Sequence, residues 1–466
     1  MKQVWCRVRA IGALAILSLS LAGCGGSSSQ SAMGAMPPPV APVAIQSFTP
    51  ASGTVHVGES TQITAVFTGD SASIDGIGPV QSGVPVATPA LARATTFTLT
   101  VRRGSQQMEA HLSIAARYQD RIRTLAPSPV AYTQHVAMAL ADGSALFMGG
   151  NTSASPNVPD TDRSHRFDPV TETVSAGPEL AFSAEADITT PVALSNGGFL
   201  LVGPGINSAI HLDGGLRTTQ AFNPTTATFH RVGDLVIRHD GGGTATPLDG
   251  GSVLVAGGQL PAVSGTERYD AVSERWSAAA NMSTARRGHT ATRLADGRVL
   301  IAGGFTCCDQ TGEVVLNTAE VYDPRSDVFQ PTGAMLNARG FHAATLLADG
   351  RVLVTGGFAA GGDSTTASAE IYDPLTGRFT AAGAMQAGRS VHSAILLTDG
   401  RVLVVGGLQP TSMTDIFDPQ TGVWLPGPTP APAVAATATL LRNGKVLVFG
   451  GQDAAGFPIP TVMLFE

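Results

Sequence analysis

Short apolar runs separated by turns follow one another along most of the chain, and residues 342–374 (HAATLLADGRVLVTGGFAAGGDSTTASAEIYDP) show the pattern most clearly. An alternating apolar run meets Asp349-Gly350, a second run follows, and Gly356-Gly357 ends it. Two apolar runs joined by Asp-Gly predict a β-hairpin, because a type I′ turn needs positive φ at both central residues. The pattern therefore predicts short antiparallel strands.

This unit recurs about every 50 residues. An Asp or Asn stands at a fixed distance before a large apolar residue in most repeats, as from Asp323 to Phe329. Each repeat is therefore predicted to contain four strands, A to D, and such a period predicts a β-propeller. The Gly-Gly step occurs at positions 149–150, 257–258, 303–304, 356–357, 406–407 and 450–451, and Gly203-Pro204 fills the one long gap.

The two ends of the repeat region complement each other. The last repeat has strands A, B and C, the third being TVMLFE, but it has no strand D. The segment from Arg121 to Thr124 precedes the first repeat at the distance that strand D keeps elsewhere. It is predicted to complete the last blade, which closes a ring of seven blades and leaves no unpaired strand edge.

Residues 44–116, ahead of the repeats, alternate with a period of two. Phe97, Leu99 and Val101 are separated by polar neighbours, and Gly-rich turns separate this run from others like it. The alternation predicts a small antiparallel sandwich.

The phrases LADGRVLVxGG and AExYDPxTGxF resemble the kelch family, and especially the seven-bladed central domain of galactose oxidase and its bacterial relatives. The segments SFTPASGTVHVGESTQI and TTFTLTV resemble bacterial immunoglobulin-like surface domains. The expected fold class is all-β: a seven-bladed kelch-type β-propeller over residues 117–466, preceded by a small immunoglobulin-like β-sandwich over residues 44–116. The sandwich is expected to act as a spacer, with carbohydrate binding as the alternative.

Residues 1–23 resemble a bacterial lipoprotein signal peptide. A basic start and an apolar run too short to span a bilayer are followed by Leu-Ala-Gly and then Cys24. The resemblance implies cleavage before Cys24, lipidation of its thiol and an outer-membrane location, and an ordinary secretory signal is the alternative. Residues 24–43, rich in Gly, Ser and Pro, are expected to form a flexible linker.

The charge balance limits the partners. The chain has 35 Asp and Glu against 28 Lys and Arg, a formal net charge of −7. This balance opposes nucleic-acid binding and provides no basic stripe for anionic lipids. Membrane association is therefore expected only through the lipid anchor, and a glycan or a protein is the expected ligand.

One face of the predicted propeller is expected to bind that ligand. The A–B and C–D turns share one face and are uniform, whereas the B–C and D–A loops share the other and vary in length. Variable loops on an invariant frame are where binding usually resides. Cys307 and Cys308 form either a vicinal disulfide or two thiols. The candidate ligand-binding residues on this loop face are Tyr132, Gln259, Arg287, Cys307, Cys308, Asp309, Phe341, Val391 and Gln452.

Other recurring residues are expected to hold the blades together. Four histidines begin strand A, and they are predicted to make structural hydrogen bonds, with a metal site as the alternative. The kelch resemblance implies that three arginines tie neighbouring blades by bonding carbonyls, with a carboxylate-binding ring as the alternative. The predicted structural residues are His135, His289, His342, His392, Arg286, Arg339, Arg389, Trp276 and Trp424.

The resemblance to galactose oxidase raises the question of catalysis. Galactose oxidase and glyoxal oxidase hold copper with two tyrosines and two histidines, one tyrosine being cross-linked to a cysteine. In this chain Tyr269, Tyr322 and Tyr372 fall on strand C, and no Tyr-His dipeptide occurs. The sequence has no GxSxG, Walker or HExxH motif either.

These observations predict no cofactor, no metal and no enzymatic activity. The expected function is that of an envelope-anchored binding module for a glycan or a protein. A sugar-directed periplasmic enzyme resembling the kelch mutarotases and a structural envelope component are the alternatives.

Overall fold

We describe the protein from a computed structural model. It covers residues 41–466 except for positions 134, 151–162, 182–190, 203–216, 240, 259–261, 310–311, 360–363, 409–412, 430–433 and 454. The predicted signal peptide, the lipidation site Cys24 and the candidate Gln259 lie outside the described residues, so their roles stay predictions. Val43–Glu466 form one compact unit. No helix in the described ranges is long and apolar enough to cross a membrane.

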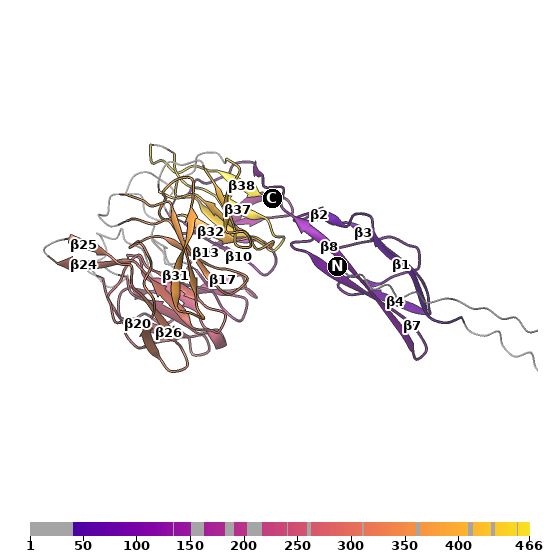
Figure 1. The fold of residues 1–466 in the computed structure, drawn as a ribbon, viewed down its shortest axis with the longest axis horizontal. Helices are drawn as coiled ribbons and strands as arrows, with labels where there is room; N and C mark the ends of the chain where they lie inside the picture. Colours follow the sequence, from indigo (N-terminus) through magenta and orange to yellow (C-terminus); the bar gives the residue numbers. More distant parts are fainter. Residues whose placement is uncertain are drawn as a thin grey trace, which may run out of the picture. The chain divides into compact units, whose positions relative to one another are not determined.

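Two β-sheets occupy the segment before the repeats (Figure 1). Their strand orders are β1-β3-β6 and β2-β8-β7-β4-β5, with β2 parallel to β8. Phe97, Leu99 and Val101 on β7 are buried while their neighbours are more exposed, so the predicted alternation is confirmed. The strands are β1 (Ala44–Pro50), β2 (Thr54–His56), β3 (Gln62–Thr68), β4 (Ser71–Ile74), β5 (Gly78–Pro79), β6 (Val86–Ala87), β7 (Thr95–Arg103) and β8 (Gln106–Arg117).

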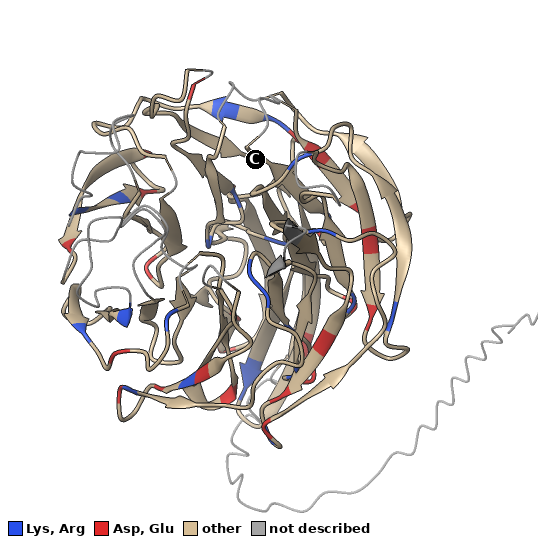
Figure 2. Ribbon diagram, turned by 90° about the vertical axis from the view of Figure 1, so that its left-hand side faces the viewer, with Lys and Arg blue, Asp and Glu red and all other residues tan. Residues whose placement is uncertain are grey.

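Seven antiparallel sheets of four strands each form a propeller around a central axis, which Figure 2 shows. The predicted fold class is confirmed. We number the blades 1 to 7 in the order of their innermost strands. A hairpin of β24 (Phe305–Asp309) and β25 (Gly312–Val315) is inserted between the second and third strands of blade 4, and η2 (Asp249–Gly251) is a short 3-10 turn in blade 3.

Each blade orders its four strands from the central axis outward. In that order, blades 1 to 3 contain β10 (Val136–Ala139), β11 (Ala145–Met148), β12 (Arg163–Asp168) and β13 (Thr173–Glu179); β14 (Val192–Ala193), β15 (Phe199–Val202), β16 (Thr219–Asn223) and β17 (Thr228–Arg231); and β18 (Thr244–Pro247), β19 (Val253–Ala256), β20 (Thr266–Asp270) and β21 (Arg275–Ala278).

Blades 4 to 7 follow the same order. They contain β22 (Thr290–Arg293), β23 (Val299–Ala302), β26 (Ala319–Asp323) and β27 (Val328–Pro331); β28 (Ala343–Leu346), β29 (Val352–Thr355), β30 (Ser368–Asp373) and β31 (Arg378–Ala384); β32 (Ser393–Leu396), β33 (Val402–Val405), β34 (Asp415–Asp418) and β35 (Val423–Pro426); and β36 (Thr437–Leu440), β37 (Val446–Phe449), β38 (Val462–Phe465) and β9 (Ile122–Thr124).

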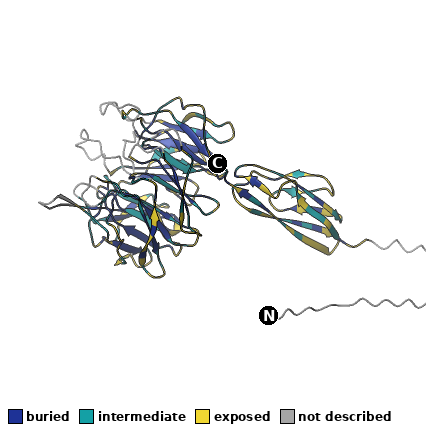
Figure 3. Ribbon diagram, turned by 45° about the horizontal axis from the view of Figure 1, so that its top comes forward, coloured by how far each residue is buried: buried dark blue, intermediate teal, exposed yellow. Residues whose placement is uncertain are grey.

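The second strand of each blade is buried along its whole length, as the dark strands in Figure 3 illustrate. In β29, Val352 and Val354 belong to a core cluster shared with blade 4, whereas Leu353 belongs to one shared with blade 6. Both faces of a blade are therefore covered by its neighbours. This explains why these strands are continuous apolar runs instead of alternating ones.

The ring closes as predicted. β9 pairs antiparallel with β38, with Ile122 opposite Phe465 and Arg123 opposite Leu464. Beside this pair, the Glu466 carboxylate accepts hydrogen bonds from Arg121, Arg123 and Lys445. Burial alone would raise the pKa of Glu466, but these three cations outweigh it and lower the pKa to about 2. These ion pairs hold the closing strands together, and we call Glu466 with its three cations the Glu466 clasp.

The hairpin turns differ from the predicted type I′. In blade 5, Gly350 has φ of 88°, but Asp349 is not among the residues with positive φ. The Gly350 amide donates to Leu347 O, and the Leu347 amide donates to Arg351 O. The connection is a three-residue loop with glycine alone in the left-handed region, and the Asp349 carboxylate caps the Arg351 amide instead.

Candidate ligand-binding face

A layer of buried polar pairs lies beneath the loop face. Arg286, Arg339 and Arg389 have no solvent exposure, and each forms an ion pair with a carboxylate on the third strand of its own blade. In blade 5, Arg339 Nη2 lies 2.7 Å from Glu370 Oε1, and its Nη1 donates to Gly356 O and Ser368 O. The prediction that these arginines tie neighbouring blades is wrong: their side chains do bond carbonyls, but the carbonyls belong to their own blade, so the arginines are enclosed within single blades. They cannot reach a ligand on the surface.

Tyr132 occupies the same position in blade 1, which corrects its assignment as a ligand contact. Its carbonyl accepts from the Gly451 amide, as the Arg389 carbonyl accepts from the Gly357 amide. Its side chain is fully buried, and its hydroxyl lies 2.7 Å from His165 Nδ1. The phenol therefore stands where blades 4 to 6 have an arginine, and it is shielded from solvent.

The four recurring histidines join neighbouring blades. Each imidazole Nε2 lies within hydrogen-bond distance of a threonine hydroxyl in the preceding blade, for example 2.9 Å between His342 and Thr290. Burial lowers the pKa of His135, His289 and His392 to about 3, so these rings are neutral. No group of three or more metal-ligating side chains (His, Cys, Asp or Glu) occurs within the described ranges.

These histidines also explain the first glycine of the Gly-Gly step. A Cβ on Gly356 would lie 2.7 Å from His392 Cε1 and 2.4 Å from Arg389 O. The same crowding recurs at Gly303 against His342. The glycine thus leaves room for the imidazole of the next blade, and it also adopts positive φ.

The two predicted structural tryptophans bond the preceding blade through their indole N–H groups. Trp276 donates to Thr219 Oγ1 at 3.1 Å, and Trp424 donates to Ala382 O at 2.7 Å. Both rings pack on strand-C aromatics, Tyr269 and Phe417 respectively.

An arc of left-handed residues lies two positions before the innermost strands, at the loop-face end of the propeller axis, which we call the mouth. Gly242, Gly288, Phe341 and Val391 all have positive φ. The Gly288 amide donates to Gly242 O, the Phe341 amide to Gly288 O, and the Val391 amide to Phe341 O. Positive φ is a strained conformation for phenylalanine and especially for β-branched valine, and such strain concentrates at functional sites.

Aromatic rings and one arginine gather on this arc, and we call Arg287, Phe305, Phe341, Phe358 and Val391 the mouth cluster. The ring centroid of Phe341 lies 5.6 Å from that of Phe305 and 6.3 Å from that of Phe358. The Arg287 guanidinium carbon lies 5.2 Å from the centroid of Phe305 and 5.7 Å from that of Phe341. Phe341 and Arg287 are half-buried, and Val391 is 47% exposed.

Glycines position the Phe341 ring. A Cβ on Gly288 would lie 3.0 Å from two of its ring carbons, and one on Gly242 would lie 3.3 Å from Cε1. The ring therefore lies against bare backbone of blades 3 and 4, across the mouth. Blades 3 and 4 have glycine at this register, and the Phe341 ring of blade 5 occupies the space that side chains there would fill.

The remaining described candidates lie in connections between the second and third strands of blades 7 and 4. Gln452 is half-buried and forms bridges with Val434 and Pro458. Cys307, Cys308 and Asp309 lie on β24, next to Phe305 in the chain, but their side chains lie outside the described part. Sequence reasoning missed Phe305 and Phe358, although both directly follow a Gly-Gly step, the register that also holds Gln259 and Gln452.

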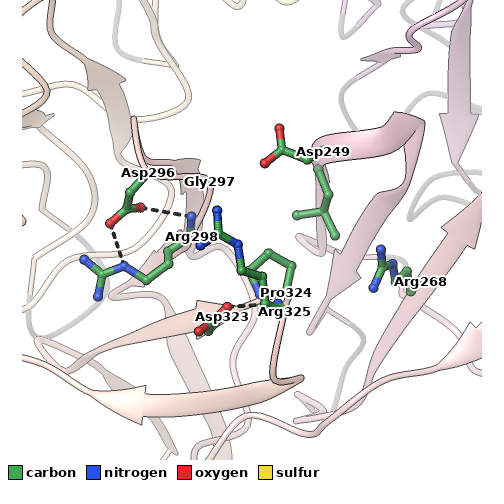
Figure 4. Close-up of a pocket in the computed structure, with 9 residues that line it drawn as sticks. Asp249, Arg268, Asp296, Gly297, Arg298, Asp323, Pro324 and Arg325 are labelled. Carbon is green, nitrogen blue, oxygen red and sulfur yellow. Dashed lines mark hydrogen bonds and ion pairs between the residues drawn. The ribbon is translucent and has the colours of Figure 1, made fainter.

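The opposite, uniform face has a pocket of about 230 Å³ between blades 3 and 4 (Figure 4). Its three carboxylates already have partners. Arg298 Nε donates to Asp296 at 2.7 Å, Asp323 caps the Arg325 amide, and Asp249 pairs with Arg293. Because these carboxylates already have partners, the mouth cluster is the better candidate site.

Comparisons with known proteins find oxidases among the similar chains. No family model matches this one. Two galactose oxidases of Gibberella zeae are each 31% identical over 114 residues, which is 24% of this chain and 16% of the relative's length. A solved fungal alcohol oxidase of the AA5 family, in complex with copper, matches with a TM-score of 0.58 and 16% identity over 74% of this chain and 76% of that one.

The prediction that the chain is not an enzyme is contradicted by these comparisons, since each of these similar proteins is named as an oxidase. The tyrosine–histidine copper donors, however, do not fit the residues present. All five tyrosines are described, and each is 8% exposed or less. Tyr118 stacks on Phe465, and the strand-C tyrosines pack on strand-D aromatics. We therefore derive no step through copper.

Proposed function

We propose that the protein is a carbohydrate-directed β-propeller that takes a saccharide at the mouth cluster. The observation that carries the proposal is the partly exposed Phe341 ring, which lies across the mouth against Gly242 and Gly288. A sugar ring has apolar C–H faces that pack on aromatic rings, and its hydroxyl groups need donors and acceptors close by. The Arg287 guanidinium lies beside the Phe341 ring and makes this part of the surface polar.

The strained backbone of the cluster supports the same site. Phe341 and Val391 keep positive φ although glycine would adopt it without strain. Their amide-to-carbonyl hydrogen bonds hold the conformation. An ordered backbone that presents partly exposed apolar side chains is a preformed surface, which reduces the entropy lost when a ligand binds.

The comparisons support a sugar as ligand, and because the similar proteins are oxidases, catalysis must be tested as well as binding. The relatives matched by sequence are galactose oxidases, although the chain spans only 16% of their length. The test therefore measures both binding of galacto-oligosaccharides by calorimetry and their consumption over time, using the full chain.

The discriminating variant is Phe341→Ala, and the matched control is Leu375→Ala. Leu375 is 95% exposed and lies in a C–D turn of the uniform face. Loss of the aromatic surface is expected to weaken binding about tenfold, because stacking and area burial together contribute about 1–2 kcal/mol. The control is expected to bind as wild type does. Binding that is absent in the wild type, or unchanged in Phe341→Ala, contradicts the proposal.

A further inference from the structure

Blade 3 has a histidine at the position where blades 4 to 6 have a buried arginine. His239 Nδ1 lies 2.7 Å from the carbonyl oxygen of Gly257, and Arg339 bonds the equivalent carbonyl of blade 5. On the third strand of the blade, Glu267 Oε1 lies 3.3 Å from His239 Nε2, at the register that Glu370 occupies in blade 5. A group that can lose its charge therefore stands where blades 4 to 6 have a permanent cation.

Both nitrogens of this imidazole face hydrogen-bond acceptors. A peptide carbonyl has no proton to give, so Nδ1 has to donate to Gly257 O. An ionised carboxylate also only accepts, so Nε2 has to donate to Glu267. An imidazole donates from both nitrogens only when it is the imidazolium cation. The pair is enclosed, because the two side chains are 1% and 2% exposed.

The Glu267 carboxylate also holds the loop that leads into blade 3. Its two oxygens accept hydrogen bonds from the amides of Val236 at 2.7 Å and Ile237 at 2.8 Å. Burial alone would raise the pKa of Glu267, but the bonds from His239 and from these amides outweigh it and lower the pKa. The carboxylate is therefore ionised, and this one buried group fastens three residues of the loop.

The fastened loop continues into the left-handed arc at the mouth. Gly242 follows three positions after His239, and its carbonyl accepts the Gly288 amide at 2.8 Å. A Cβ on Gly242 would lie 3.3 Å from the Phe341 ring. The His239 carbonyl also packs so closely on Gly243 that a Cβ there would have no room. The position of His239 thus helps to set the position of the backbone beneath Phe341.

The other charged or titratable groups around His239 come from blade 4 and from its own chain neighbour. Burial, Arg286 and His239 all lower the pKa of His289, so the charge on His239 acts across the boundary between the blades. Arg238, the residue before it, is exposed. Two of these three groups carry a permanent positive charge, so Glu267 is the group that stabilises a proton on His239.

From these contacts we propose that His239 is a pH-dependent positioning residue of the mouth cluster. While it is protonated, it donates to both buried acceptors and fixes the blade-3 loop. When it loses a proton, one acceptor faces a lone pair, and the loop that carries Gly242 loosens. The stabilisation is present in acid and is lost as the pH rises, which is the opposite sign to that of the neutral histidines between the blades. The inference concerns the backbone and does not rest on a saccharide being the ligand.

The first test measures the protonation of His239 directly in the full chain. Nitrogen-15 NMR of the imidazoles distinguishes a ring with two N–H groups from a ring with one, and the spectrum of His239→Gln identifies the His239 signals. At about pH 5.5 both nitrogens of His239 are expected to carry protons. A His239 ring with a single N–H at this pH overturns the proposal.

The second test compares amide hydrogen exchange in the wild type and in His239→Arg at equal pH, from about 5.5 to about 8.5. Arginine keeps its charge throughout this range. At the upper end the amides of Val236 and Ile237 are expected to exchange at least about tenfold faster in the wild type, because a hydrogen bond to a buried charged group is worth at least a factor of ten. At the lower end the two proteins are expected to differ less. The Gly288 amide is expected to respond in the same direction.

The matched control is His230→Arg, which makes the same substitution beside a carboxylate that is 46% exposed, that of Glu274. It is expected to keep the exchange rates of the wild type at every pH. His239→Gln, which has no charge to lose, is expected to exchange fast over the whole range, and it replaces the arginine variant if that one does not fold. Thermal melting checks that each variant is folded.

Two results would contradict the proposal. If the ratio of the exchange rates of wild type and His239→Arg does not change with pH, His239 is not a pH-dependent residue. If Val236 and Ile237 respond but the Gly288 amide does not, the effect stays within the loop and His239 does not position the mouth cluster.

Discussion

At the scale of single residues, the buried ion pairs limit most strongly which substitutions the propeller tolerates. Arg339 has no exposure and Glu370 is 1% exposed, so each requires the other. Two further ion pairs repeat the arrangement in blades 4 and 6. A buried charge that loses its partner is far more costly than an exposed one.

Replacing Arg339 with Ala is therefore expected to destabilise the protein by about 3–5 kcal/mol, because Glu370 stays buried without a cation. The matched control is Arg351→Ala, whose partner Asp349 is 47% exposed and whose loss is expected to matter by about 1 kcal/mol or less. Urea denaturation of the three proteins measures both values. If both variants lose a small and equal amount of unfolding free energy, the buried Arg339–Glu370 pair contributes no more to stability than the exposed pair.

Residue-level prediction from the sequence succeeded where a residue type repeats in register and failed where one blade departs from the rest. The three buried arginines recur before strand A and lie where the repeat implies. Tyr132 breaks that series, so its type suggested a ligand contact, yet its backbone register makes it the buried counterpart of the arginines. The Phe341 seat was not predictable, because it depends on glycines of two other blades.

At the scale of elements, the ion pairs of the Glu466 clasp help to hold the closing sheet together. Arg121, Arg123 and Lys445 all reach the Glu466 carboxylate, which is 7% exposed. The main-chain groups of Arg121 and Glu466 bond each other in both directions as well. The first strand of the propeller is thus held beside β38 by both backbone and side chains.

Substituting Glu466→Gln is expected to lower the stability by about 1–3 kcal/mol, because charge-assisted bonds become weaker neutral ones. This loss of stability is expected near neutral pH and is expected to disappear in acid, where the Glu466 carboxyl of the wild type is protonated. The folded pKa of about 2 lies below the ordinary value of 4.5, so the carboxylate stabilises above pH 4.5 and that contribution is lost as the pH falls toward 2. Thermal melts against pH test this, with the exposed Glu274→Gln as the control.

Elements were predictable to the extent that local pattern determines them. Continuous apolar runs, Gly-Gly steps and the missing last strand sufficed for seven blades and their closure. The turn type was wrong, because Asp-Gly suits both a two-residue and a three-residue loop, and pairing across the hairpin decides between them. The β24–β25 hairpin gave no clear alternation, so its strands were not predicted.

At the scale of the whole molecule, four buried neutral imidazoles link the blades. Burial lowers the pKa of each of them, to about 3 for His135, His289 and His392. The unfolded chain takes up protons near its ordinary histidine pKa of about 6.5, whereas His135, His289 and His392 do so in the folded protein only near pH 3. Stability is therefore fully present above pH 6.5 and falls as the pH drops toward 3.

We expect the free energy of unfolding to fall by up to about 1.4 kcal/mol per pH unit for each such histidine between those limits. Denaturant titrations from about pH 7.5 to about pH 5.5 measure the slope, because the Glu466 carboxyl stays ionised there in both the folded and the unfolded chain. His392→Gln is expected to reduce the slope by about one proton. A slope unchanged in that variant would contradict the assignment of a neutral, buried His392.

The bond between Arg121 and Glu466 spans 345 positions of the chain. During synthesis β9 emerges ahead of every other described strand of the propeller, yet its sheet partner, β38, emerges after all six intervening blades. The circle therefore cannot be completed while the ribosome is still making those blades. Completion requires the two most widely separated strands to meet, so this single pairing carries the largest loop-closure entropy of any in the propeller.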